Sequence, residues 1–248
     1  MEIKRIKLPG VKTIIGVLSG KGGTGKTFVA SCLAATLAKL GKKTGILDAN
    51  ISCPDIFKIF GVTQKIVPTA DRKIEPAEKY GIKIVSMAGL SSAEDEPIVW
   101  RGPIVSKIIQ QLLKETLWGE LDALIIDFPS GTSDAVLTIL QNFAVDGVLI
   151  VTTPQELSTL DARRSINMAL AMKIPILGII ENMRGEVFGE GGAARVAETM
   201  RIPLLGSIPL RKQITALCDA GMPPVFQMEE LEMIFGKVAR IAMEKIMV

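Results

Sequence analysis

The chain has 248 residues, 48% of them hydrophobic and 4% aromatic, and a formal net charge of +3. Its length allows one large α/β domain or two small ones, and its aliphatic composition is typical of parallel strands covered on both faces. The small net charge argues against nucleic-acid binding, and no apolar stretch reaches the roughly 18 uncharged residues of a membrane span. Histidine is absent, which excludes histidine-based catalysis and metal ligation.

The first recognisable motif is glycine-rich. Residues 20–27 read GKGGTGKT and match the phosphate-loop (P-loop) pattern G-x-x-x-x-G-K-[ST]. An apolar run over residues 11–18 predicts a strand before the loop, and residues 28–40, followed by Gly41, predict a helix after it. This order presents backbone N–H groups and a positive helix end to a phosphate chain. The predicted ATP-binding residues of the loop are Gly20, Lys21, Gly22, Gly23, Thr24, Gly25, Lys26 and Thr27.

Two further predicted strands end in an acidic residue. Residues 43–47 lead to Asp48, and residues 121–126 lead to Asp127, as in a Walker B strand. Because the carboxyl ends of parallel strands line the ligand crevice, both carboxylates are expected to face the phosphates. Lys26 is expected to lie along the β- and γ-phosphates. We predict a Mg²⁺ site formed by Thr27, Asp48 and Asp127, with Asp127 acting through a water molecule.

The remaining elements alternate between strands and helices. Residues 62–80 contain charged and turn residues and are expected to be irregular. Later strands are expected at residues 82–87, 146–154, 175–183 and 206–210, and later helices at residues 104–117, 155–168 and from 229 onward. The alternation predicts the α/β fold class: a single P-loop NTPase domain over residues 1–248, with a mostly parallel β-sheet flanked by helices on both faces.

Lys21 gives the loop a second lysine and makes it a deviant P-loop. With this feature the chain resembles the dimeric ATPases that include MinD, ParA, the nitrogenase iron protein and the Mrp-type iron–sulfur carriers. The resemblance implies a homodimer in which Lys21 reaches the nucleotide of the opposite subunit and stabilises charge on the transferring phosphoryl group. A solvated loop lysine is the alternative. Residues 100–103, WRGP, resemble the Mrp-type proteins more than MinD or ParA.

Two segments resemble the switches of the Mrp-type proteins. Residues 48–55, DANISCPD, resemble the first switch, which implies that Asp48 orients or deprotonates the attacking water. Asn50 departs from the family pattern there, because it replaces an acid. Residues 127–134, DFPSGTSD, resemble the second switch, which implies that the Gly131 backbone N–H contacts the γ-phosphate.

The resemblance also implies a site for the base. Asn182, in the sequence Glu-Asn-Met, would read the adenine edge, because a side-chain amide can donate and accept hydrogen bonds at once. Pro209 would border the base through its backbone.

The cysteines depart from the resembled family. Mrp-type carriers have a C-x-x-C pair whose thiolates bind a bridging [4Fe–4S] cluster between two subunits. Here the corresponding connection, residues 184–187, reads RGEV, and the only cysteines are Cys32, Cys53 and Cys218. The resemblance implies an iron–sulfur cluster, but a cluster on this chain requires widely separated cysteines to converge. Cys53 is expected to be a small buried residue. The absence of a disulfide framework, together with an ATP site, predicts a cytoplasmic protein.

These observations predict a dimeric switch ATPase that binds and slowly hydrolyses Mg-ATP, acting in iron–sulfur cluster carriage or assembly. Its expected partners are a second copy, apo-protein clients or assembly factors, and neither nucleic acid nor membrane. Two alternatives stay open: a MinD/ParA-like positioning ATPase, and an ATP-binding regulatory subunit without a cluster of its own. The mixed charge of the C-terminal helix, in which Glu229 and Glu232 accompany Lys237 and Arg240, argues against membrane targeting.

Overall fold

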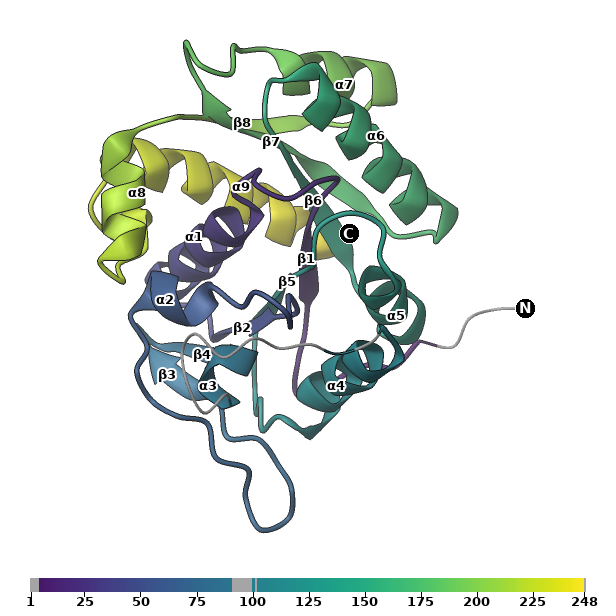
Figure 1. The fold of residues 1–248 in the computed structure, drawn as a ribbon, viewed down its shortest axis with the longest axis vertical. Helices are drawn as coiled ribbons and strands as arrows, with labels where there is room; N and C mark the ends of the chain where they lie inside the picture. The colour runs from purple at the N-terminus through teal and green to yellow at the C-terminus, as the bar shows by residue number, and fades with distance from the viewer. Residues whose placement is uncertain (1–4, 91–99, 101, 248) are drawn as a thin grey trace.

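The computed structural model describes residues 5–90, 100 and 102–247. Within them an eight-stranded sheet has the order β3-β4-β2-β5-β1-β6-β7-β8 (Figure 1). All neighbouring strands pair in parallel except β3 and β4. The predicted α/β class with a mostly parallel sheet is therefore confirmed. Arg101, in the WRGP element, lies outside the described residues.

The central strands are buried along their whole length. Every residue of β1, β2, β5 and β6 is buried, as expected for parallel strands covered on both faces. This burial explains why they appear in the sequence as continuous apolar runs. The strands are β1 (Ile14–Ser19), β2 (Thr44–Asp48), β3 (Ala77–Lys79), β4 (Ile82–Val85), β5 (Ala123–Asp127), β6 (Gly147–Thr152), β7 (Ile176–Arg184) and β8 (Leu204–Pro209).

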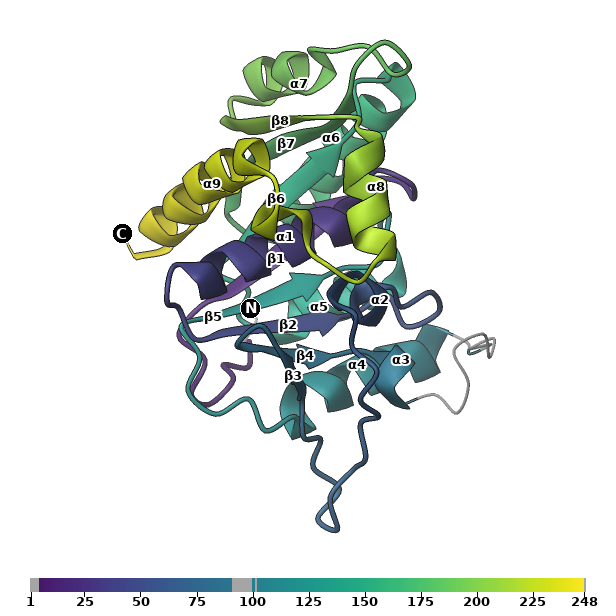
Figure 2. The same cartoon turned by 90° about the vertical axis from the view of Figure 1, so that its left-hand side faces the viewer.

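Helices cover both faces of the sheet. Figure 2 shows α1, α2, α8 and α9 on the face turned to the viewer, while α4, α5 and α6 lie behind the strands. The helices are α1 (Lys26–Lys39), α2 (Ile56–Phe60), α3 (Met87–Leu90), α4 (Gly102–Glu115), α5 (Asp134–Asn142), α6 (Glu156–Ala171), α7 (Gly192–Met200), α8 (Lys212–Asp219) and α9 (Glu229–Met247).

The C-terminal helix α9 docks on the body of the protein. Phe235 is fully buried and meets the ring of Phe28 edge-on, with 6.0 Å between the ring centroids. Leu231, Val238 and Ala242 are also fully buried. The apolar face of α9 is therefore used in the core. Among the described helices, none has the length and apolar character needed to cross a membrane.

The expectation for residues 62–80 was only partly right. The segment forms the short edge strand β3, which pairs antiparallel with β4 through Ala77–Ile84 and Lys79–Ile82. Ala77 is the only buried residue of the three. A strand of three residues with one buried position has too little alternation to be recognised by sequence period.

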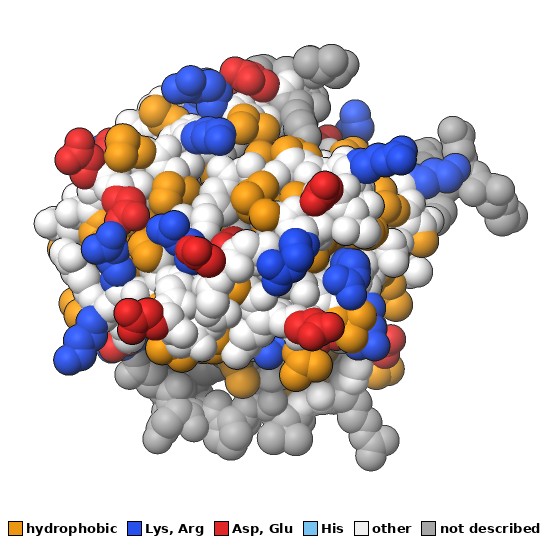
Figure 3. Space-filling model, turned by 90° about the horizontal axis from the view of Figure 1, so that it is seen from above, with side chains coloured by type: hydrophobic (Ala, Val, Ile, Leu, Met, Phe, Trp, Pro, Cys, Tyr) orange, Lys and Arg blue, Asp and Glu red, His pale blue; other side chains and the backbone are white. Residues whose placement is uncertain are grey.

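Charge is dispersed over the surface that Figure 3 displays. Lysine and arginine side chains alternate there with aspartate and glutamate, and orange apolar side chains lie between them. This interspersion agrees with the net charge of only +3.

Candidate functional site

The P-loop joins β1 to α1, and its backbone requires glycine at specific positions. Gly23 and Gly25 have φ values of +80° and +79°, and Gly25 is the residue that precedes α1. A Cβ at Gly20 would lie 2.1 Å from the backbone carbonyl carbon of Asp161, and one at Gly25 would lie 2.1 Å from Nδ2 of Asn182. The loop therefore approaches α6 and β7 closely. The first N–H groups of α1 have no acceptor within the helix, as at every helix N-terminus, and can bind an anion there.

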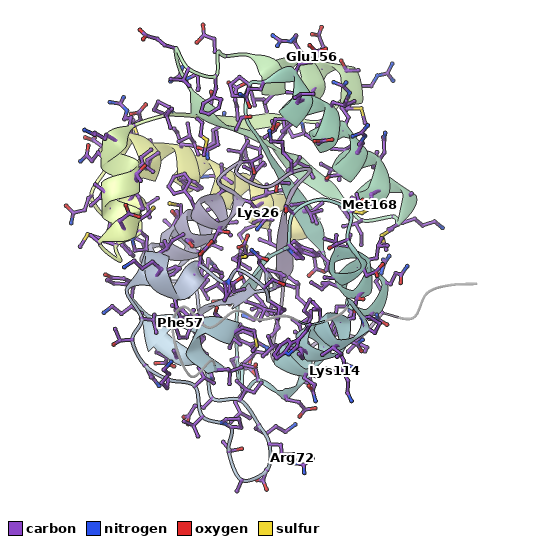
Figure 4. The ribbon with its side chains drawn as sticks, in the orientation of Figure 1. Lys26, Phe57, Arg72, Lys114, Glu156 and Met168 are labelled. Carbon is purple, nitrogen blue, oxygen red and sulfur yellow. The ribbon has the colours of Figure 1, made fainter. Side chains whose placement is uncertain are left out.

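Lys26, Thr27 and Asp127 form a connected group at the start of α1. The Lys26 Nζ lies 2.6 Å from Oδ1 of Asp127, and the Thr27 hydroxyl donates to Oδ2 over 2.7 Å. Asp127 is fully buried and Lys26 is 6% exposed. Burial raises the pKa of Asp127, and the two donors oppose this effect. Figure 4 places Lys26 near the centre of the molecule, far from the loop that carries Arg72.

Asp48 lies beside Asp127 because the two residues are paired in the register of β2 and β5. Its carboxylate is fully buried and accepts hydrogen bonds from the backbone N–H groups of Asn50 and Ile56 and from the hydroxyl of Ser86. Burial, together with the nearby negative charge of Asp127, raises the pKa of Asp48 to about 7. Such a carboxyl group can exchange a proton near neutral pH.

The raised pKa of Asp48 makes the stability of the fold depend on pH. An acid whose pKa is higher in the folded state favours folding below its ordinary pKa near 3.8, and this contribution is lost as pH rises through about 7. We expect Asp48→Asn to raise the free energy of unfolding at pH 8 by about 4 kcal/mol relative to the parent, and to change it little at pH 4. Chemical denaturation at both pH values measures the difference.

Asp122→Asn is the matched control for this prediction. The hydrogen bonds that Lys12 and the Lys43 N–H donate to Asp122 lower the pKa of that carboxyl group, so its contribution has the opposite sign. An Asp48→Asn variant with the parent's pH dependence would show that folding does not raise the pKa of Asp48.

The second switch packs against the P-loop. Gly131 has φ +77°, and its N–H donates to the carbonyl of Ser19 over 2.9 Å. Contact of this N–H with a γ-phosphate, as predicted, would require exchange of that bond. Lys21 is partly exposed at the start of the loop, and its side chain forms no ion pair with any residue that the structure describes.

A cavity of about 300 Å³ opens beside the N-terminus of α1. Asn182 from β7 and Pro209 from β8 both line it, next to Gly25 and Phe28. The Asn182 Nδ2 donates to the Thr24 carbonyl over 2.8 Å, which leaves its Oδ1 free of that bond. The structure thus brings both residues predicted for the base to the end of the P-loop.

Several residues at this cavity were missed from the sequence. Asp55, directly before α2, lines it, and burial and the charge of Asp127 raise the pKa of the Asp55 carboxyl group. Helix α8 supplies much of the opposite wall through Ile214, Thr215, Cys218 and Asp219. The position of Asp55 in the first switch was the only signal available, and nothing in the sequence of α8 marked it.

The cysteines are dispersed, and the expectation for Cys53 was wrong. Cys53 is exposed, because the loop after β2 turns outward and is held there by a 2.8 Å hydrogen bond from Asn50 Nδ2 to the Cys53 carbonyl. Cys32 is buried in α1, and burial raises the pKa of its thiol; burial likewise raises the pKa of Cys218 to about 11. Over the described ranges, no group of three or more cysteine or acidic residues is arranged to hold a metal ion.

Comparison with known families agrees with this geometry. A family model described as "ParA: NUBPL iron-transfer P-loop NTPase" matches residues 10–246. The chain belongs to this family. The resemblance inferred from the sequence is therefore confirmed.

Curated relatives of this NTPase are named iron–sulfur cluster carrier proteins. The relative from Deinococcus radiodurans is 43% identical over 229 residues, covering 88% of this chain and 65% of the relative. The relative from Methanocaldococcus jannaschii is 42% identical over 254 residues, covering 98% and 88%. The chain thus spans less than two thirds of the Deinococcus protein's length.

Solved structures show the same architecture. A nucleotide-binding protein from Archaeoglobus fulgidus, in complex with ADP and with cobalt, is 36% identical with a TM-score of 0.76, over 89% of this chain and 90% of that one. The cell division ATPase MinD of Pyrococcus furiosus has a TM-score of 0.71 at 22% identity, over 94% and 98%. The MinD likeness concerns the fold alone.

Proposed function

We propose that this NUBPL-type NTPase is a homodimeric Mg²⁺-dependent ATPase whose hydrolysis cycle switches its conformation during iron–sulfur cluster carriage or assembly. One observation carries the proposal most directly. The P-loop residues Lys26 and Thr27 bind Asp127, which is paired with Asp48 in the sheet, and they directly follow Gly25, which lines the cavity together with Asn182. The ADP bound by the Archaeoglobus relative and the names of the curated relatives support the same function.

The site residues have different roles in the proposed hydrolysis of ATP. Lys26 and the loop N–H groups bind the phosphates, and Asp48 orients the attacking water or accepts its proton. Thr27, Asp127 and Asp48 offer the oxygen ligands that Mg²⁺ prefers, and the ion would neutralise phosphate charge. Lys21 acts on the nucleotide of the second copy, and Gly131 reports the γ-phosphate. We propose slow turnover, because the three hydrogen bonds to Asp48 oppose its movement toward water.

The cysteines that could bind an iron–sulfur cluster are arranged differently from those of the resembled carriers. Cys53 is the exposed cysteine, while Cys32 is buried and Cys218 lies in the cavity beside α8. A [4Fe–4S] cluster needs four thiolate ligands, and two copies offer two exposed Cys53 side chains. We therefore propose that the chain assists cluster assembly with a partner that supplies the remaining thiolates.

Anaerobic reconstitution with iron and sulfide tests this role. We expect the purified protein to hydrolyse Mg-ATP, and to gain no stable cluster absorbance when it is reconstituted alone. Cys53→Ser is the matched variant, since it removes the exposed thiol and leaves the nucleotide site intact. A complete cluster on the isolated protein that is lost in Cys53→Ser would show that the chain carries the cluster directly. If no ATP hydrolysis is measured, either alone or with added partner proteins, the proposed ATPase activity is contradicted.

The positioning alternative is less well supported. A MinD-like protein that binds a membrane through its terminal helix would need an available apolar face. In α9 the apolar residues Leu231, Phe235 and Val238 are fully buried against the body. Sedimentation with lipid vesicles would distinguish the two functions.

A further inference from the structure

The buried carboxylate of Glu181 has no part in the functions described above. Glu181 is 2% exposed and lies in β7, in register with Ser207 of β8. One of its oxygens accepts from the Ala193 N–H over 2.9 Å, and the other accepts from the Ser207 hydroxyl over 2.9 Å and the Gly191 N–H over 3.3 Å. No ion pair in the described part of the chain includes it. The N-terminus of α7 and a hydroxyl therefore stabilise its charge.

The two residues that follow Glu181 belong to the cavity beside the P-loop. Side chains alternate along a strand, so Glu181 faces α7 while Asn182 faces the P-loop, where it donates to Thr24. Met183 lines the cavity with φ +60°, a left-handed conformation that costs a non-glycine residue on the order of 1 kcal/mol.

The strand is irregular at this point. The pairing of β7 with β8 shifts register twice, between Ile179 and Ile180 and again between Glu181 and Arg184. Glu181 is thus the last regularly paired residue before the segment that enters the cavity. Its three hydrogen bonds connect β7 to β8 and α7 at the position where the backbone departs from strand geometry.

We propose that Glu181 is a positioning residue for recognition of the nucleoside. By holding β7 to α7 and β8, its carboxylate fixes the backbone from which Asn182 and Met183 reach the cavity. Glu181 does not itself line that cavity. The inference rests on the proposed nucleotide-binding function and adds a requirement for base recognition that the P-loop does not share.

The test compares binding of ATP with binding of inorganic triphosphate, both with Mg²⁺, by calorimetry. Glu181→Ala is expected to weaken ATP binding about tenfold and triphosphate binding much less, because Glu181 bonds α7 and Ser207 and is linked to the P-loop through the Asn182 bond to the Thr24 carbonyl. Glu181→Gln should stay closer to the parent than Glu181→Ala does. Its amide oxygen can accept from the Ala193 N–H while its amide nitrogen donates to the Ser207 hydroxyl, so that the 3.3 Å bond from the Gly191 N–H is the one lost.

Val196→Ala is the matched control, because Val196 is 2% exposed in α7 and its truncation destabilises the same helix without altering the carboxylate. Its ratio of ATP to triphosphate affinity should equal the parent's. If Glu181→Ala does not fold, Ser207→Ala removes one of the three bonds and should shift the ratio in the same direction by less. A parent-like ratio in both Glu181→Ala and Ser207→Ala, or an equal shift in Val196→Ala, would overturn the inference. A parent protein that binds no ATP would instead contradict the proposed function.

Discussion

Replacing Lys26 with alanine is expected to abolish nucleotide binding, with ATP affinity falling by about a hundredfold or more. The Lys26 ammonium is buried beside the helix N-terminus that would receive the phosphates, and its removal takes away the cation paired with Asp127. Calorimetric titration with Mg-ATP measures the loss. Lys39→Ala, at the far end of the same helix and paired with the exposed Glu232, is the matched control and should bind as the parent does.

The Lys26 variant also affects stability, which must be separated from binding. Removal of the lysine leaves the fully buried Asp127 without its cation, a change that typically costs about 3–5 kcal/mol. The double variant Lys26→Ala/Asp127→Asn removes the uncompensated charge and should recover most of that loss while still failing to bind ATP. Unchanged ATP affinity in a folded Lys26→Ala protein would refute the phosphate-loop assignment.

Lys21→Ala is expected to leave ATP binding nearly unchanged and to reduce turnover on the order of a thousandfold, as loss of a trans-acting cation does in related phosphoryl transfer. The Lys21 side chain is partly exposed and forms no ion pair within the described residues, so its removal disturbs no buried partner. Steady-state phosphate release and calorimetry on the same preparation separate the two effects. A parent-like rate would exclude a catalytic role for Lys21.

Mixing two inactive variants tests whether Lys21 acts across a dimer. A Lys21→Ala protomer keeps Asp48, and an Asp48→Asn protomer keeps Lys21. If Lys21 acts on the opposite subunit, one site of each mixed dimer contains both groups, and about one site in four of an equal mixture becomes active. If Lys21 acts on its own subunit, no site is complete and the mixture stays inactive.

The positions of the residues predicted for the nucleotide site were largely predictable because their signals are local. The spacing of glycines and Lys26 in the P-loop, and a strand ending at each of Asp48 and Asp127, are each contained in a short stretch of sequence. Parallel strands place their carboxyl ends together, so the convergence of these stretches followed from fold class alone. The structure pairs Asp48 with Asp127 in register, as this argument requires; the catalytic roles of these residues stay predictions.

Residues that reach the site from distant, unpatterned segments could not be predicted. Thr215 and Cys218 belong to an ordinary amphipathic helix, and only the packing of α8 opposite α1 brings them to the cavity. Cys53 was expected inside because free cysteine is commonly buried, but a hydrogen bond from Asn50 holds its loop outward. Residue type therefore predicts burial poorly where a side-chain hydrogen bond determines the direction of a loop.

By itself, the sequence determined the fold class, the family's phosphate-binding loop and the two strand-end acids, because backbone periodicity and glycine spacing are properties of neighbouring residues. Only the tertiary structure decided which hydrogen bonds these groups form. Lys26 and Thr27 donate to Asp127, Asp48 accepts from three donors, and Glu181 accepts from N–H groups at the start of α7. Apart from the bond from the Asn50 N–H to Asp48, these contacts join residues from 8 to 101 positions apart. Burial and hydrogen bonding at such separations exist only after the chain has packed, and they set the pKa values and positions on which the proposed chemistry depends.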